Sequence, residues 1–285
     1  MHSGRAVVLT YHSHHVVGPS YAENDHLALA MDLELITEVG GLLVPLADIV
    51  DSLVGDRDSR SPRHGAWLRV AITFDDGPNY DVMPLDHPVL GRQPGFLGVM
   101  RQFIAKHGER CQSGLSATSF VIASPEARRV IETTFDPQYT FQEPGSMTDD
   151  WWDGAIDTGL ISIANHSWDH LHPALSELAH SQQARADFAR VRTPEDADRQ
   201  IAAAGRFIAA RTHGRASPFF AYPFGHYNEF LTKHYFPGVR THGVRAAFTV
   251  DPRRVAPAQN VWRIPRFVCG DDWKSPGELE AILLA

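Results

Sequence analysis

The chain has 285 residues, of which 43% are hydrophobic and 21% are charged, and its formal net charge is −8 at pH 7. This composition is typical of a soluble globular protein, and the length suits one α/β barrel without a second core. The acidic balance and the absence of a basic patch or stripe argue against nucleic acid and against anionic membranes as partners. Two cysteines, Cys111 and Cys269, do not make a disulfide framework.

No apolar stretch is long enough to span a bilayer. The first five residues run directly into a predicted strand and contain no apolar core of a signal peptide. We therefore expect a cytoplasmic protein, or a secreted or periplasmic one if a leader has been removed.

The first half of the chain alternates apolar runs with helical patterns. In chain order we predict a strand at Val7–Thr10, a helix at Met31–Val39, a strand at Leu42–Val44, a helix at Leu46–Leu53, an exposed loop at Asp56–Gly65, a strand at Leu68–Phe74, a long insertion at Tyr80–Gly95, a helix at Phe96–His107 and a strand at Ala117–Ala123. The insertion follows the strand that ends at Phe74, and we expect it to overhang whatever site forms there.

The second half continues the alternation. We predict a helix that begins at Ser124-Pro125, a helix at Ser146–Thr158, a strand at Leu160–Ala164, a helix at Thr193–Thr212, strands at Phe219–Tyr222, Ala246–Val250 and Arg263–Val268, and a last helix capped by Ser275–Glu278. Alternating strands and helices predict a parallel sheet in the α/β class. The loops after its strands converge on one face, where residues remote in sequence can meet.

Two adjacent carboxylates, Asp75 and Asp76, follow the strand Leu68–Phe74 and precede the turn pair Gly77-Pro78. Asp, Gly and Pro are ordinary turn residues, so the motif alone is compatible with a plain turn. However, two like charges side by side are unfavourable unless a cation or a proton separates their roles.

A second cluster follows the strand Leu160–Ala164. His166 and His170 are four residues apart, a spacing that directs two imidazoles at one ion in a helical turn or a wound loop. A single histidine in such a stretch is more often a surface or capping residue. Two at ligand spacing, together with the carboxylate pair, favour a metal site.

These motifs resemble those of the polysaccharide deacetylases, the NodB-homology group within carbohydrate esterase family 4. Thr73–Pro78 is similar to their first signature, and His166–His170 to their second, a His-(Ser/Thr)-x-x-His motif. Phe220–Gly225 resembles the segment that walls the active-site groove, and Leu9–His12 the first strand. The pieces occur in family order, so the resemblance implies a distorted (β/α)7 barrel of parallel strands and a single catalytic domain over residues 1–285.

The resemblance also implies a division of roles. Asp76, His166 and His170 would hold a divalent metal, with zinc as the first choice and cobalt, nickel or iron also compatible with this donor set. Water on the metal would be the nucleophile, Asp75 the general base, and the backbone N–H of Phe224 the oxyanion donor. The implied enzyme is a hydrolase of C–N bonds other than peptide bonds, which removes N-acetyl groups from an amino sugar or polysaccharide.

The chain departs from the family pattern at two points. Ala221 stands where many members carry an arginine that orients the base; Arg266 is the candidate replacement, with a surface arginine on an edge strand as the alternative. The family's C-terminal Leu-His pair, which supplies the general acid, is absent, since no histidine follows His242. His12 is the first substitute and His226 the second. Three other histidines are expected to be solvated: His14, His15 and His172.

Aromatic residues provide further candidates. Trp151, Trp152 and Trp273 are possible sugar-stacking surfaces, although at least one of the first two is expected in the core. Trp168 could shape the pocket or pack beneath it. Two other functions stay open: cleavage of another amide in a small metabolite, and a non-catalytic carbohydrate-binding relic. Intact Asp75, which a bare binder does not need, counts against the relic.

Overall fold

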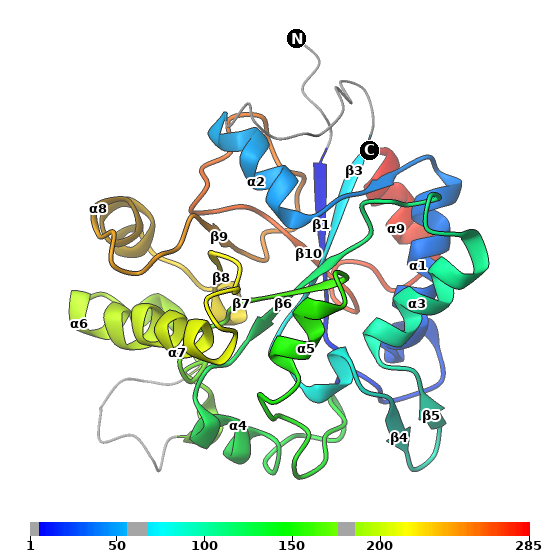
Figure 1. The fold of residues 1–285 in the computed structure, drawn as a ribbon, viewed down its shortest axis with the longest axis horizontal. Helices are drawn as coiled ribbons and strands as arrows, with labels where there is room; N and C mark the ends of the chain where they lie inside the picture. The colour runs from blue at the N-terminus through cyan, green and yellow to red at the C-terminus, as the bar shows by residue number, and fades with distance from the viewer. Residues whose placement is uncertain (1–5, 56–67, 176–185) are drawn as a thin grey trace.

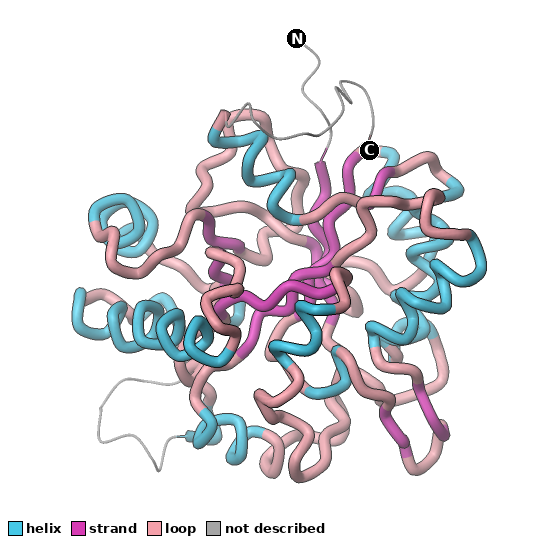
Figure 2. The backbone as a smooth tube through the Cα atoms, in the orientation of Figure 1, coloured by secondary structure: helices cyan, strands magenta, loops and turns pink. Residues whose placement is uncertain are grey.

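The computed structural model describes residues 6–55, 68–175 and 186–285. The predicted loop Asp56–Gly65 lies outside the described residues. The core of the molecule is a curled parallel sheet surrounded by helices (Figures 1 and 2), as predicted for a distorted (β/α) barrel. Its strands follow the order β10 (Phe267–Val268), β1 (Ala6–Tyr11), β3 (Arg69–Phe74), β6 (Ala117–Val121), β7 (Ile161–Asn165), β8 (Phe219–Ala221) and β9 (Ala246–Phe248), and the short β2 (Leu42–Leu43) pairs with the start of β3.

One segment links the two edges of this sheet. Ile264 pairs in parallel with Phe248 of β9, and its N–H donates to Ala247 O at 2.9 Å. Three residues later, β10 pairs with β1, with Phe267 opposite Leu9. The predicted strand Arg263–Val268 is therefore regular over only two residues, because the chain must cross from one edge to the other within it.

The central strands are buried on both faces. Along β1, Val7, Leu9 and Tyr11 pack against the surrounding helices, whereas Val8 lies in a second cluster with Ala71 and other side chains inside the curled sheet. Such strands read as continuous apolar runs, because neither face meets water. This explains why the sequence pattern located them well.

The helices cover the outside of the sheet (Figure 1). They are α1 (Asp25–Glu38), α2 (Leu46–Val54), α3 (Phe96–His107), α4 (Pro125–Ile131), α5 (Trp152–Asp157), α6 (Pro194–Ala197), α7 (Ala203–Arg211), α8 (Phe236–Gly238) and α9 (Pro276–Leu284). Helix α1 starts earlier than predicted, because Asn24 caps it by accepting hydrogen bonds from the N–H groups of His26 and Leu27. The predicted helix Ser146–Thr158 forms only over α5. Among the described residues, no helix combines the length and apolar character needed to cross a membrane.

The three tryptophans expected to stack on sugar are part of the core. Trp151, Trp152 and Trp273 are 5%, 0% and 1% exposed, so none of them offers a stacking surface, and the expectation that at least one of the first two packs in the core is confirmed. The Trp273 indole N–H donates to Tyr21 Oη at 2.8 Å, which satisfies its polar atom inside the protein. Trp168 packs edge-on against Phe207 with ring centroids 5.8 Å apart, so it supports the fold beneath the His motif.

Gly77, directly after the carboxylate pair, is required by both its backbone and its surroundings. Its φ is +69°, and a Cβ atom there would lie 2.5 Å from Val121 Cγ1. Gly40 has a similar φ of +75°, but a Cβ there would meet nothing within 4 Å. Comparing substitutions at Gly77 and Gly40 therefore separates the energetic cost of backbone strain from that of a steric clash.

We predict that Gly40→Ala lowers the free energy of unfolding by about 1 kcal/mol, from backbone strain alone. Gly77→Ala should lower it by about 3 kcal/mol, because the clash with Val121 adds to the strain. Urea denaturation of both variants measures the difference. Equal losses would show that the close approach to Val121 is relieved without cost.

Candidate active site

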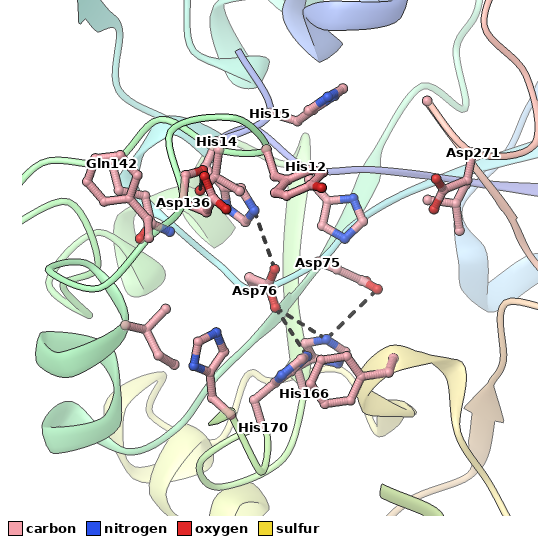
Figure 3. A pocket seen from close by; sticks show the side chains of 18 of the residues that line it. His12, His14, His15, Asp75, Asp76, Asp136, Gln142, His166, His170 and Asp271 are labelled. Carbon is pink, nitrogen blue, oxygen red and sulfur yellow. Dashed lines mark hydrogen bonds and ion pairs between the residues drawn. The ribbon is translucent and has the colours of Figure 1, made fainter. Parts of the chain in front are cut away.

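Three side chains from the ends of β3 and β7 converge on one point (Figure 3). The Nε2 atoms of His166 and His170 each lie 3.5 Å from Asp76 Oδ1. Ligand atoms of the three residues lie within 4.8 Å of one another. The structure thus brings together the three residues that the sequence analysis proposed as metal ligands.

The local backbone that positions these side chains is wound rather than helical. Asp76, Ser167 and His170 have positive φ angles of 71°, 73° and 60°. The Ser167 N–H donates to Asn165 Oδ1 at 2.8 Å, and the His170 N–H donates to Ser167 Oγ at 2.9 Å. Side-chain hydrogen bonds therefore compensate for a backbone conformation that non-glycine residues rarely adopt.

The two imidazoles are prepared to bind a cation. His166 Nδ1 lies 3.0 Å from Ala221 O, and since a carbonyl only accepts, Nδ1 donates, which leaves Nε2 as the atom that faces Asp76. Burial lowers the pKa of His170 to about 3, despite the opposing charge of Asp76, so this ring is neutral. Burial pushes the pKa of Asp76 up, but the neighbouring histidines outweigh it, and the carboxyl is ionised. A carboxylate and two imidazoles are a donor set that fits a divalent cation such as zinc.

Asp75 has a different partner from its neighbour. Both terminal nitrogens of Arg266 donate to it, each at 2.7 Å, and Arg266 is fully buried. The Arg266 Nε–H donates to Thr249 O at 3.1 Å, which fixes the plane of the guanidinium. Burial would raise the pKa of Asp75, but Arg266 outweighs burial and holds it below its ordinary value. Arg266, directly before β10, is thus the buried partner of Asp75, as expected of a replacement for the arginine absent at Ala221, and the alternative of a surface Arg266 is wrong.

The two substitutes for the missing acid lie in different places. His12, at the end of β1, lines the same cavity as Asp75 and Asp76. Its backbone N–H donates to Asp25 Oδ2 at 2.8 Å, which fixes the chain there. The His226 side chain is 46% exposed, lies 3.5 Å from Asp187, and is not among the residues that line this cavity.

His14 is a site residue that the sequence analysis missed. It was expected to be solvated, but it is 7% exposed, and its Nε2 lies 3.6 Å from Asp76 Oδ2 (Figure 3). Burial lowers its pKa to about 4. The turn after β1, in which the His15 N–H donates to His12 O at 2.8 Å, brings the rings of His12 and His14 to a centroid distance of 5.7 Å. His15 and His172 also line the cavity, and His15 contacts Asp25 at 2.7 Å, so neither is fully solvated.

Phe224 lies beside the candidate metal ligands. Its ring centroid is 4.4 Å from that of His170, and its φ is 57°. The N–H groups of Gly225 and His226 donate to Tyr222 O and Pro223 O, at 2.8 and 3.0 Å. Within the described residues, no hydrogen bond from the Phe224 N–H is found, so this donor is free for a ligand.

The three candidate metal ligands, Asp76, His166 and His170, line a cavity of about 710 Å³. One wall is the loop between α4 and α5, which contributes Thr134, Phe135, Asp136, Tyr139, Thr140 and Gln142. The insertion Tyr80–Gly95 was expected to overhang the site, but none of its residues, all of them described, lines the cavity. It forms the antiparallel hairpin β4 (Leu85–His87) and β5 (Gly91–Gln93), and His87 packs on Phe141 of that loop with ring centroids 4.7 Å apart.

Comparison with known proteins establishes which class of fold this is. No protein-family model matches the chain, and no curated protein matches its sequence. Solved structures do match: the deacetylase PplD of Streptococcus pyogenes has a TM-score of 0.62, 14% identity and coverage of 98% of both chains. A de-N-acetylase of Aggregatibacter actinomycetemcomitans has a TM-score of 0.59, 14% identity and coverage of 97% of this chain and 99% of its own.

IcaB of Ammonifex degensii matches with a TM-score of 0.59 and 20% identity, over 99% of this chain and 98% of its own. The chain therefore has the fold of the polysaccharide deacetylases. The family resemblance drawn from the short motifs is confirmed at the level of the fold, although the sequences have diverged widely.

The buried pair of Asp75 and Arg266 predicts a large loss of stability when one partner is removed. Arg266→Met should lower the free energy of unfolding by about 3 to 5 kcal/mol, because it leaves a buried carboxylate uncompensated. Arg245→Met, which breaks a surface pair 2.8 Å from Asp51, should cost less than about 1 kcal/mol. Urea denaturation compares them, and similar losses would contradict a special role for the buried pair.

Because Asp76, His166 and His170 converge on one point, we predict that each chain binds one metal ion. Protein purified and incubated with zinc should hold about one metal ion per chain by elemental mass spectrometry, and His166→Ala/His170→Ala should lose it. His213→Ala/His234→Ala, which removes two exposed imidazoles, is the matched control and should retain the metal. Native protein without metal after this treatment would rule out the proposed ligand set.

Proposed function

We propose that this protein is a metal-dependent hydrolase that removes N-acetyl groups from an amino sugar or its polymer. The observation on which the proposal rests is that two adjacent carboxylates have different partners. Asp75 is paired with buried Arg266, while Asp76 faces His166 and His170 in the same cavity. The structural neighbours support the substrate class, because they are described as deacetylases and one as a de-N-acetylase.

Asp76, His166 and His170 would hold the cation. When bound, a divalent cation such as zinc supplies Lewis-acid polarisation of the acetyl carbonyl and lowers the pKa of water. The remaining steps are carried out by side-chain and backbone groups of the protein itself.

Asp75 acts as the general base. Its Oδ2 lies 3.9 Å from His166 Nε2, so this oxygen faces the ligand cluster and is the atom that takes the proton of the attacking water. Arg266 keeps the carboxyl ionised and oriented through two hydrogen bonds. Each carboxylate oxygen retains a lone pair for the proton, so the pairing does not block this role.

The developing oxyanion and the leaving amine require donors. The Phe224 N–H is the proposed oxyanion donor, since the turn around it engages the neighbouring N–H groups and not this one. His12, from β1, is the proposed general acid for the amine, because its ring lines the cavity beside the carboxylate pair. Products would then be free acetate and a primary amine on the sugar.

The non-catalytic alternative is weakened by the buried ion pair. Burying Asp75 and Arg266 takes two charges out of water, and such a pair contributes little net stability compared with apolar residues. A protein that only bound sugar would gain nothing by keeping this pair next to Asp76. Cleavage of an amide in a small metabolite uses the same chemistry, so the substrate assay must separate the two activities.

Zinc-loaded protein should release acetate from N-acetylated chitooligosaccharides, and Asp75→Asn should lower kcat by about 10² to 10⁴-fold. The variant keeps the shape of the side chain and should keep its metal, because Asp75 is not in the ligand set. Acetylated small amines, tested in parallel, identify the metabolite activity if they are preferred. Full turnover in Asp75→Asn would exclude it as the base.

A further inference from the structure

The loop that carries both candidate histidine ligands has a backbone conformation that is rare for residues other than glycine. Ser167, His170 and Leu171 have positive φ angles of 73°, 60° and 46°. Such a backbone persists only where its surroundings hold it, and it is concentrated at functional sites. The hydrogen bonds from the N–H groups of Ser167 and His170 hold part of the loop from within. Further support comes from a helix behind it.

That helix contains an irregular turn. Helices α6 and α7 follow one another along one rod (Figure 1) and are joined by a turn of π-helix, Asp198–Ala202, called the π-turn below. The Ala203 N–H donates to Asp198 O, which is one residue further back than in an α-helix. The helix predicted at Thr193–Thr212 therefore includes a widened turn. Turns of this kind are rare and occur frequently at functional sites.

The π-turn contacts the loop through two backbone carbonyls. The Trp168 N–H donates to Gln200 O at 2.8 Å, and Asn165 Nδ2 donates to Ile201 O at 2.9 Å. A helix carbonyl ordinarily accepts from an N–H group of the next turn, whereas these two accept from donors outside the helix. Asn165 directly precedes His166, and Trp168 lies between the two histidines. The π-turn thus holds the chain on both sides of His166.

The side chain of Gln200 holds the next residue of the loop. Its Nε2 donates to Asp169 Oδ1 at 2.8 Å, and its Oε1 accepts from the Asp169 N–H at 3.4 Å. Only one orientation of the amide satisfies both bonds, because the backbone N–H donates and the carboxylate accepts. Asp169 directly precedes His170, so the two bonds fix the backbone from which the second imidazole projects. Gln200 is 3% exposed and does not line the cavity, so it acts from behind the site.

We propose that Gln200 is a positioning residue for the metal site. Presented by the π-turn, it holds the loop in the conformation that directs His166 and His170 at Asp76. The inference rests on the ligand set of the proposed function, and it is independent of which acetylated compound is cleaved. Groups that orient metal ligands from behind typically change metal affinity by about 10- to 100-fold when they are replaced.

Gln200→Met tests this role, because methionine has a similar length and fills the same space but makes neither hydrogen bond. Titration of metal-free protein with zinc, in competition with a chelating dye, should give about tenfold weaker binding than in the native protein. The cobalt-loaded variant should show a changed visible absorption band, since this band reports how the ligands are arranged around the ion. Gln200→Glu, which places a second carboxylate against Asp169, should weaken zinc binding at least as much.

Gln112→Met is the matched control. Gln112 is also buried, at 8% exposed, and its side chain accepts from the Leu43 N–H and donates to Gly41 O and Thr37 Oγ1. It does not line the cavity. Both methionine substitutions should lower the midpoint of urea denaturation, but Gln112→Met should keep the native zinc affinity and cobalt band. Equal losses of affinity in the two variants would show a general effect of stability and overturn the positioning role.

The Asp169→Ala background shows whether Gln200 acts through Asp169. In that background Gln200→Met should change zinc affinity less than about twofold, because the partner is already gone. A full tenfold loss there would overturn the proposed route. Native affinity and an unchanged cobalt band in Gln200→Met would overturn the positioning role and leave the deacetylase proposal standing.

The two proposals can also fail separately in the other direction. Protein that binds zinc, loses affinity in Gln200→Met and releases no acetate would overturn the deacetylase proposal and support the positioning role. Native protein that binds neither zinc nor cobalt would overturn both.

Discussion

The site depends on giving two adjacent carboxylates opposite surroundings. Asp75 and Asp76 are consecutive, yet one is fixed by a buried guanidinium and the other faces a cluster of imidazoles. The left-handed backbone at Asp76, followed by Gly77, turns the chain sharply enough to send the two side chains to different partners. Without that turn, both charges would share one environment, and one of them would be driven to bind a proton. The proposed roles of base and metal ligand thus follow from backbone geometry that is present without a substrate.

The segment that links the two edges of the sheet also assembles the site. Arg266 lies in the segment that crosses from β9 to β1, and its partner Asp75 is 191 residues earlier. The guanidinium reaches Asp75 because Ile264 pairs with β9 and β10 pairs with β1. The same crossing places the Arg266 Nε–H on Thr249 O. In many members of the family that the motifs resemble, the arginine that orients the general base comes from the strand that carries Ala221 in this chain. In this chain the Ala221 carbonyl accepts from His166 Nδ1 at 3.0 Å and so orients that ring.

The features that depend on local sequence patterns were predicted correctly from the sequence. The features that depend on packing between distant segments were missed. Buried strands, capped helices and the two short motifs carry their signal in neighbouring residues, so the sheet and the ligand cluster were located. Arg266 could be inferred because the missing arginine left a charge to be balanced. His14 was missed because its contacts are with residues distant in sequence: its ring lies 3.6 Å from Asp76, and its carbonyl accepts from the N–H of Phe141, more than a hundred positions away. The tryptophans were misjudged for the converse reason, since residue type suggests sugar binding and only packing reveals the core.

A third carboxyl shows how the charge of the cavity is balanced. Asp81 is fully buried, and Ser13 and Ser119 each donate to it at 2.6 Å. Burial, together with the charges of Asp76 and Asp75, raises the pKa of Asp81 to about 7, although the two hydroxyls act in the opposite direction. Asp81 is therefore partly protonated at neutral pH and contributes less than a full negative charge near Asp75 and Asp76. Arg266 compensates the charge of Asp75, whereas burial keeps His14 and His170 neutral, so these two rings do not compensate the charge of Asp76. A cation held by the proposed ligand set would complete this balance.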